Sequence, residues 1–90
     1  MRIANATDYG LTAGVWTSDV KVAHRMARDL RAGTVWVNTY NIVTSEAPFG
    51  GFKQSGWGRE NGPYALHDFT EVKQVYVELA ERPTDWYGEA

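Results

Sequence analysis

The 90-residue sequence contains no cysteine, which excludes disulfides, thiolate metal sites and a cysteine nucleophile within these residues. Runs of lysine or arginine are also missing and the net charge is −2, so binding to nucleic acid or to an anionic membrane has little support. No apolar run approaches about 18 residues, and the N-terminus lacks the apolar core of a signal peptide. We therefore expect a cytoplasmic protein of one small domain, without a nucleic-acid or membrane partner.

Glycine is concentrated in residues 46–60, which also carry three aromatic rings. Such a segment does not suit a helix interior or a central strand, and it is too aromatic for a flexible linker. We expect an ordered loop in which glycines allow close backbone approach while the rings wall a surface. A loop longer than about 12 residues is usually functional. Its spacing fits neither the phosphate-binding loop nor the dinucleotide fingerprint, so the sequence predicts no cofactor site in this chain.

Before this loop, the sequence predicts a strand, a helix and a second strand. Residues 11–17 are uncharged and rich in β-branched and aromatic side chains, as in a strand covered on both faces. Residues 20–31 have the spacing of an amphipathic helix, and residues 34–38 read as another strand. Tight connections of this kind make a βαβ unit with parallel strands. The predicted fold class is therefore α/β.

The ends of the predicted helix carry recognisable signals. Ser18 or Asp19 is placed to cap its N-terminus. Val22, Met26 and Leu30 form one apolar stripe that would face the sheet. Gly33 is placed to end the helix in the left-handed conformation.

The other segments are shorter and less regular. Residues 1–7 resemble the last turns of a helix, and Pro63 can start a short helix over residues 64–68. Residues 71–79 alternate as in a half-buried strand, and the tail 80–90 is expected to be irregular. Together these elements leave one face of the sheet without cover. We therefore expect partner structure that the chain itself does not contain.

Two motifs, in this order and spacing, resemble the C-terminal end of an aldehyde dehydrogenase. They are Ala-Gly-Thr-Val-Trp-Val-Asn at residues 32–38 and Pro-Phe-Gly-Gly-x-Lys-x-Ser-Gly-x-Gly-Arg-Glu at residues 48–60. Shorter matches occur at residues 4–11 and 64–73, so the resemblance covers nearly the whole chain. It implies a fragment of the family's catalytic domain over residues 1–70, an oligomerisation strand over 71–80 and a tail over 81–90.

The resemblance also implies an activity, the oxidation of an aldehyde to an acid with NAD or NADP. In the family, a thiolate attacks the aldehyde, a hydride passes to the cofactor and the thioester is hydrolysed. The family's cysteine, general base and cofactor domain lie upstream of the matching region. Because this chain has no cysteine, we expect these 90 residues to be inactive alone.

Several residues receive roles through the same resemblance. Phe49 matches a phenylalanine that lines the aldehyde tunnel, and Ile42 and Val43 match a variable stretch at the tunnel mouth. Glu60 matches a glutamate proposed to relay protons or water. A last group, expected at a subunit interface, consists of Arg59, Glu71, Val75 and Val77.

Simpler interpretations stand beside these roles. Phe49 could serve only in packing, and Glu60 could form a surface ion pair with Arg59. His24 and His67 are isolated, so the sequence predicts no metal site. Val75, Val77 and Leu79 could belong to a sheet core rather than to a docking edge.

An alternative from a different functional class is a non-enzymatic assembly module. In that hypothesis the strand over residues 72–79 pairs with another copy or with a full-length aldehyde dehydrogenase subunit. The expected partners are then a homo-oligomer or those subunits. A third alternative is a gene remnant without a selected role.

Overall fold

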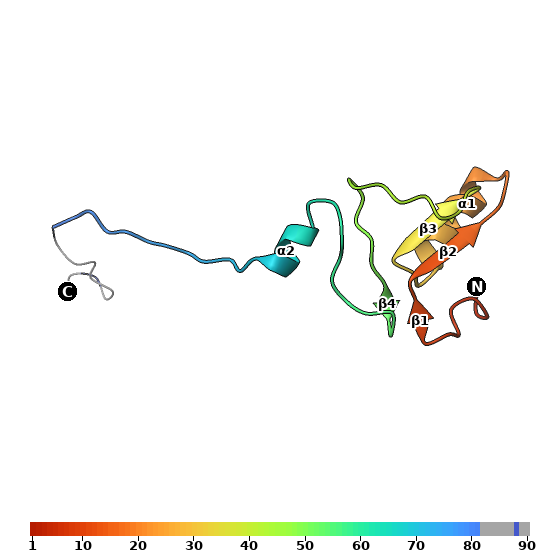
Figure 1. The fold of residues 1–90 in the computed structure, drawn as a ribbon, viewed down its shortest axis with the longest axis horizontal. Coiled ribbons are helices and arrows are strands. Elements are labelled where there is room, and N and C mark those ends of the chain that lie inside the picture. Colours follow the sequence, from red (N-terminus) through yellow and green to blue (C-terminus); the bar gives the residue numbers. More distant parts are fainter. Residues whose placement is uncertain (82–87, 89–90) are drawn as a thin grey trace.

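The computed structural model describes residues 1–81 and 88 of the chain. Most of the expected irregular tail, residues 82–87 and 89–90, lies outside the described residues. The elements follow one another along the chain as shown in Figure 1. They are β1 (Tyr9–Gly10), β2 (Thr12–Val15), α1 (Val20–Asp29), β3 (Thr34–Val37), β4 (Phe52–Lys53) and α2 (Ala65–Phe69).

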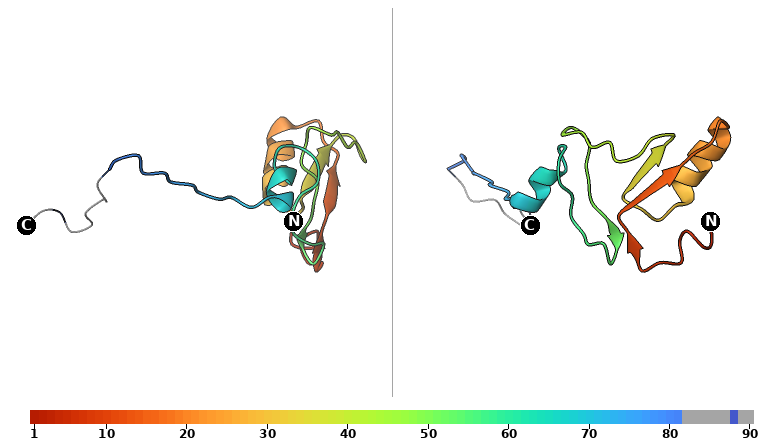
Figure 2. Two further views of the ribbon diagram at one scale, coloured as in Figure 1. Left: turned by 60° about the vertical axis from the view of Figure 1, so that its left-hand side comes forward. Right: turned by 45° about the vertical axis from the view of Figure 1, so that its right-hand side comes forward.

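Strands β2 and β3 and helix α1 form the predicted βαβ unit. The two strands are parallel, with Thr12 opposite Thr34 and Val15 opposite Val37. Helix α1 lies along this small sheet, as two further views show (Figure 2). The small core of this unit consists of Val15, Ala23, Leu30 and Trp36. The parallel pairing and the apolar contact face of the helix were both correctly predicted.

Helix α1 begins as predicted but ends earlier. Asp19 is the N-cap, and its Oδ1 accepts hydrogen bonds from the backbone N–H groups of Lys21 (2.8 Å) and Val22 (3.1 Å). The helix ends at Asp29, and the capping residue Leu30 is extended rather than left-handed. The prediction that Gly33 ends the helix was therefore wrong. Gly33 instead approaches the glycine-rich loop, where a Cβ would overlap the carbonyl oxygen of Gly50.

A second, two-stranded sheet joins the start of the chain to residues 46–60, the glycine-rich loop. Strands β1 and β4 are antiparallel, with Tyr9 opposite Lys53 and Gly10 opposite Phe52. The sequence had predicted no strand at Tyr9 and Gly10. In the structure, residues 1–7 form no helix, although a turn is closed by the Asn5 N–H and the Met1 carbonyl (3.1 Å).

The predicted strand over residues 71–79 is not formed in this chain. These residues extend away from the folded part, as Figure 1 shows. Val75, Val77 and Leu79 are 74%, 67% and 88% exposed, so their assignment to a sheet core was wrong for the single chain. The physical reason is that a strand needs a neighbouring backbone to satisfy its hydrogen bonds, and none of the described residues supplies one. The radius of gyration is 22.1 Å, against about 12 Å for a compact 90-residue domain.

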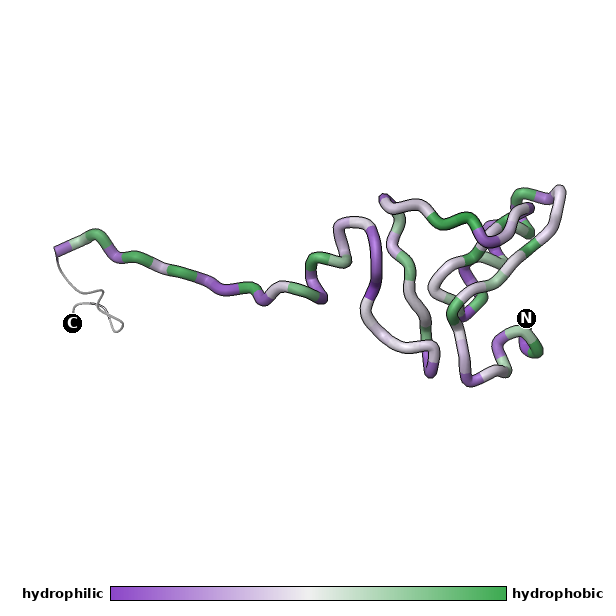
Figure 3. The backbone as a smooth tube through the Cα atoms, viewed as in Figure 1, coloured by the Kyte–Doolittle hydropathy of each residue, from purple (hydrophilic) through white to green (hydrophobic). Residues whose placement is uncertain are grey.

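Apolar residues remain exposed along much of the chain, including this extended segment (Figure 3). Helix α2 covers Ala65–Phe69, which is one residue later than predicted and of the same length, and both Leu66 (66%) and Phe69 (83%) are largely exposed. Neither helix in the described part of the chain has the length and apolar character that spanning a membrane requires.

Candidate functional site

The glycine-rich loop folds back on itself and brings together two residues that the sequence had singled out. Phe49 and Glu60 form an isolated antiparallel bridge in which each N–H donates to the other's carbonyl oxygen, both at 2.7 Å. Residues paired in this way project their side chains on the same side of the ribbon. A further bond, from the Gly62 N–H to the Ser45 carbonyl (3.0 Å), closes the base of the loop. The sequence separation of Phe49 and Glu60 had not suggested that they are direct neighbours.

Arg59 fastens the two arms of this loop to each other. Its guanidinium donates to the carbonyl oxygens of Gly51 (3.1 Å) and Gly58 (2.6 Å) and lies 5.6 Å from the centre of the Phe52 ring. Its backbone N–H donates to Asp68 Oδ2 (2.7 Å), which ties helix α2 to the loop. Arg59 makes no ion pair with Glu60 among the described residues, so the surface-pair interpretation of Glu60 is wrong.

An open hollow of about 500 Å³ lies between the loop and helix α2. Its lining residues include the aromatic residues Phe49, Trp57 and Phe69 and the acidic residues Glu60 and Asp68. Trp57 and Phe69 are 98% and 83% exposed, so much of this wall is open to water. Such a surface can hold the apolar body of a small molecule and place a carboxylate beside it.

Ile42 and Val43 do not line this hollow. They lie on the preceding segment and are 59% and 54% exposed. The carbonyl oxygen of Ile42 accepts a hydrogen bond from Trp36 Nε1 (2.8 Å), which ties this segment to the end of strand β3. The two predicted tunnel-mouth residues therefore lie outside the hollow that Phe49 lines.

Asn38 has a clear structural role that the sequence analysis did not predict. Its Oδ1 accepts from the Thr17 N–H and its Nδ2 donates to the Thr17 carbonyl, both at 2.9 Å. The side chain thus continues the β2–β3 ladder for one more residue while its own backbone turns away at φ 57°. The available signal was an asparagine directly after a strand, because asparagine tolerates the left-handed conformation.

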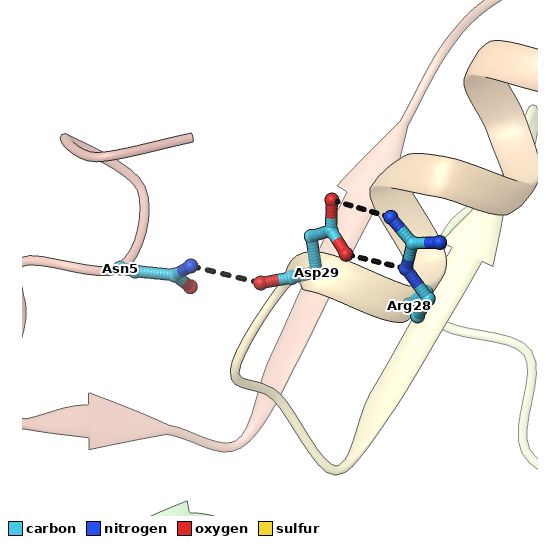
Figure 4. A network of polar contacts seen from close by, with 3 residues as sticks. All are labelled: Asn5, Arg28 and Asp29. Atoms are coloured by element: carbon cyan, nitrogen blue, oxygen red, sulfur yellow. Dashed lines mark hydrogen bonds and ion pairs between the residues drawn. The ribbon is translucent and has the colours of Figure 1, made fainter.

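A second asparagine connects the N-terminal turn to the end of helix α1 (Figure 4). Asn5 Nδ2 donates to the Asp29 carbonyl (2.9 Å), and its Oδ1 accepts from the Arg31 N–H (2.8 Å). Beside it, Arg28 donates to the Asp29 carboxylate at 2.6 and 3.2 Å. The hydrogen bonds from Arg28, together with its charge, hold the pKa of the Asp29 carboxylate below its ordinary value of 3.8.

The predicted interface residues do not touch one another in this chain. Arg59 is held by backbone carbonyls, whereas Glu71, Val75 and Val77 lie on the extended segment and are exposed. The role of all four at an interface stays a prediction. Within residues 1–81 and 88, no cluster of three metal-binding side chains is present.

A sequence model of the aldehyde dehydrogenase family matches residues 1–75 of the chain. This chain belongs to the aldehyde dehydrogenase family. A betaine aldehyde dehydrogenase of Rhizobium meliloti is 61% identical over 74 residues, which cover 82% of this chain and 15% of that protein. An aldehyde dehydrogenase of Emericella nidulans is 53% identical over 81 residues, which cover 90% and 16%.

Solved structures, among them aldehyde dehydrogenases, share the fold of this segment. The NAD⁺ complex of aldehyde dehydrogenase from Bacillus cereus superposes with a TM-score of 0.81 at 56% identity, covering 84% of this chain and 16% of that one. PnpE from Pseudomonas sp. WBC-3 gives a TM-score of 0.87 at 44% identity, covering 96% and 18%. The chain therefore spans about one sixth of the length of the aldehyde dehydrogenases that it matches.

Proposed function

We propose that these residues supply the C-terminal part of an aldehyde dehydrogenase catalytic domain, in an enzyme that oxidises an aldehyde to an acid with NAD or NADP. The observation that carries this proposal is the Phe49–Glu60 pair at the wall of the hollow. An aromatic and an acidic residue that neighbour each other in this way support a site that holds an aldehyde and handles a proton or water beside it.

In this proposal, each of the residues at the site has a stated part. Phe49 lines the aldehyde tunnel, and Ile42 and Val43 select the substrate at its mouth. Glu60 relays a proton or a water molecule towards the reacting carbon. Arg59 holds the loop in shape through Gly51 and Gly58 and, with Glu71, faces a neighbouring subunit.

The described residues do not fit a nicotinamide cofactor. A pyrophosphate needs free backbone N–H groups or an available cation. The glycine-rich loop has the spacing of neither the phosphate-binding loop nor the dinucleotide fingerprint. The guanidinium of Arg59 already donates to two carbonyl oxygens. The cofactor would therefore be held by residues other than these, and we derive no hydride step from this chain.

We also propose that the 90-residue chain is inactive alone, because a thioester requires a thiolate and the chain has no cysteine. The proposed roles of the site residues are tested in a hybrid enzyme, in which residues 1–81 replace the matching segment of the Bacillus cereus aldehyde dehydrogenase. We call this hybrid the graft. We expect the graft to be active, Glu60→Gln to lower kcat about 100-fold and Phe49→Ala to raise KM about 10-fold. Glu46→Gln, an exposed glutamate in the same loop, is the matched control. Normal kinetics of both site variants, or NADH formation by the 90-residue chain, would contradict the proposal.

The exposure of Val75, Val77 and Leu79 favours a second candidate, a self-association or subunit-assembly module. An extended segment with exposed apolar side chains can add as a strand to another sheet. The expected partner is a second copy of this chain or an aldehyde dehydrogenase subunit. The division at residues 70 and 80 and the cytoplasmic location stay predictions.

A further inference from the structure

The segment of residues 39–43 is held by the side chains of Trp36, in strand β3, and of Asn38, directly after it. The Asn38 side chain pairs with both backbone groups of Thr17, at 2.9 Å each. The indole of Trp36 donates to the carbonyl oxygen of Ile42 at 2.8 Å. The ring of Trp36 also meets the ring of Tyr40 edge to face, with centroids 5.1 Å apart.

These contacts fix the backbone of residues 39–43, which lies outside any helix or strand. Asn38 and Asn41 both adopt left-handed conformations, with φ of 57° and 60°. Asparagine reaches this region more readily than other residues with side chains, so both positions are places where the backbone turns. Ile42 and Val43 are themselves more than half exposed, so packing of their own side chains contributes little to their placement.

We infer that Asn38 and Trp36 are positioning residues that set where Ile42 and Val43 stand and thereby set which aldehyde chain length the site accepts. This inference rests on the proposed function, which makes Ile42 and Val43 the substrate-selecting pair. Neither Asn38 nor Trp36 would touch the aldehyde. They act through the backbone of residues 39–43, which carries the two selecting side chains.

Two substitutions separate this role from general folding. Asn38→Gly tolerates the left-handed φ but removes both bonds to Thr17. Trp36→Phe keeps an aromatic ring in the core but removes the indole N–H. As a conservative variant, Asn38→Asp keeps the oxygen that accepts from the Thr17 N–H, so it should restore part of the effect.

The first readout is hydrogen exchange in the 90-residue chain. Two N–H groups report on these contacts: the Thr17 amide, which donates to Asn38 Oδ1, and the Trp36 indole, which donates to the Ile42 carbonyl. We expect Asn38→Gly to speed exchange about 10-fold at both, with the amides of helix α1 unchanged. Unchanged exchange at the Trp36 indole, or equal acceleration in helix α1, would overturn the inference.

The second readout is substrate selection in the Bacillus cereus graft, which decides the matter if the short chain shows no protected amides. We expect both substitutions to change the ratio of kcat/KM between a long and a short aliphatic aldehyde about 10-fold, with kcat for the preferred one nearly unchanged. A uniform loss of activity, or an unchanged ratio, would overturn the inference.

An Ile42→Ala, Val43→Ala double variant distinguishes failure of this inference from failure of the proposed function. If it leaves the ratio unchanged, the selecting role itself fails; if it alone changes the ratio, only the positioning role fails.

Discussion

Gly33 lies directly against Gly50, so that a Cβ at Gly33 would overlap the Gly50 carbonyl oxygen. This contact joins the βαβ unit to the glycine-rich loop, because Gly33 leads into strand β3 and Gly50 follows Phe49. The N–H of Gly33 also donates to the carbonyl oxygens of Gly10 (3.0 Å) and Leu11 (3.1 Å). One glycine thus sits where three segments of the chain meet.

We predict that Gly33→Ala destabilises the fold by about 1–3 kcal/mol, because the added methyl group forces the loop backbone away. Gly14→Ala is the matched control, since its Cβ would meet mainly the exposed ring of Trp16, which can rotate aside. Urea denaturation followed by circular dichroism measures both variants. Equal stability of the two variants would show that the Gly33–Gly50 contact is not tight in solution.

Asn5→Ala is expected to lower the free energy of unfolding by about 1–2 kcal/mol. The substitution removes one hydrogen bond to the Asp29 carbonyl at the end of helix α1 and another from the Arg31 N–H. Gln54→Ala serves as control, because the side chain of Gln54 makes no hydrogen bond within the described residues. The same denaturation experiment applies, and a loss no larger than that of the control would contradict the capping role.

Asp29 makes stability depend on pH in a defined direction. Its pKa is depressed in the folded chain by hydrogen bonds from Arg28. Its contribution is therefore present above its ordinary value of 3.8 and is lost as the pH falls through the lower folded value. We expect Arg28→Gln to raise the pKa of Asp29 in an NMR titration, and the stability difference from the parent chain to vanish at acid pH.

Arg25→Gln is the control for that titration, since Arg25 has only the smallest coulombic influence on Asp29. Because Arg28 is 74% exposed, added salt should reduce the difference between the parent chain and the Arg28 variant. An equal pKa change in both variants would mean that net charge, rather than the direct hydrogen bonds, controls Asp29.

A double variant, Val75→Asp and Val77→Asp, tests assembly through the extended segment. We expect the parent chain to form a dimer or larger species with rising concentration, and the variant to remain a monomer, because charges on this face oppose strand pairing. Light scattering behind size exclusion measures the mass. Gln74→Asp places the same type of charge on the alternate face and should still associate. A parent chain that stays monomeric at all concentrations would exclude self-association.

The sequence by itself determined the local parts of this protein. Asp19 as a cap, the apolar stripe of helix α1 and the two uncharged strands predicted the βαβ unit, because each of these signals acts over only a few residues. The paired motifs around residues 32–38 and 48–60 were enough to suggest the family to which the chain belongs.

The tertiary structure decided everything that depends on distant partners. Gly33 could suit either a left-handed helix end or a close approach, and only the position of Gly50 selects between them. Phe49 and Glu60 become neighbours because the loop closes, and Asn38 gains its part because Thr17 lies across the ladder. Residues 71–79 alternate correctly for a strand, yet no strand forms, because the pattern of side chains cannot provide the second backbone that a strand must bind.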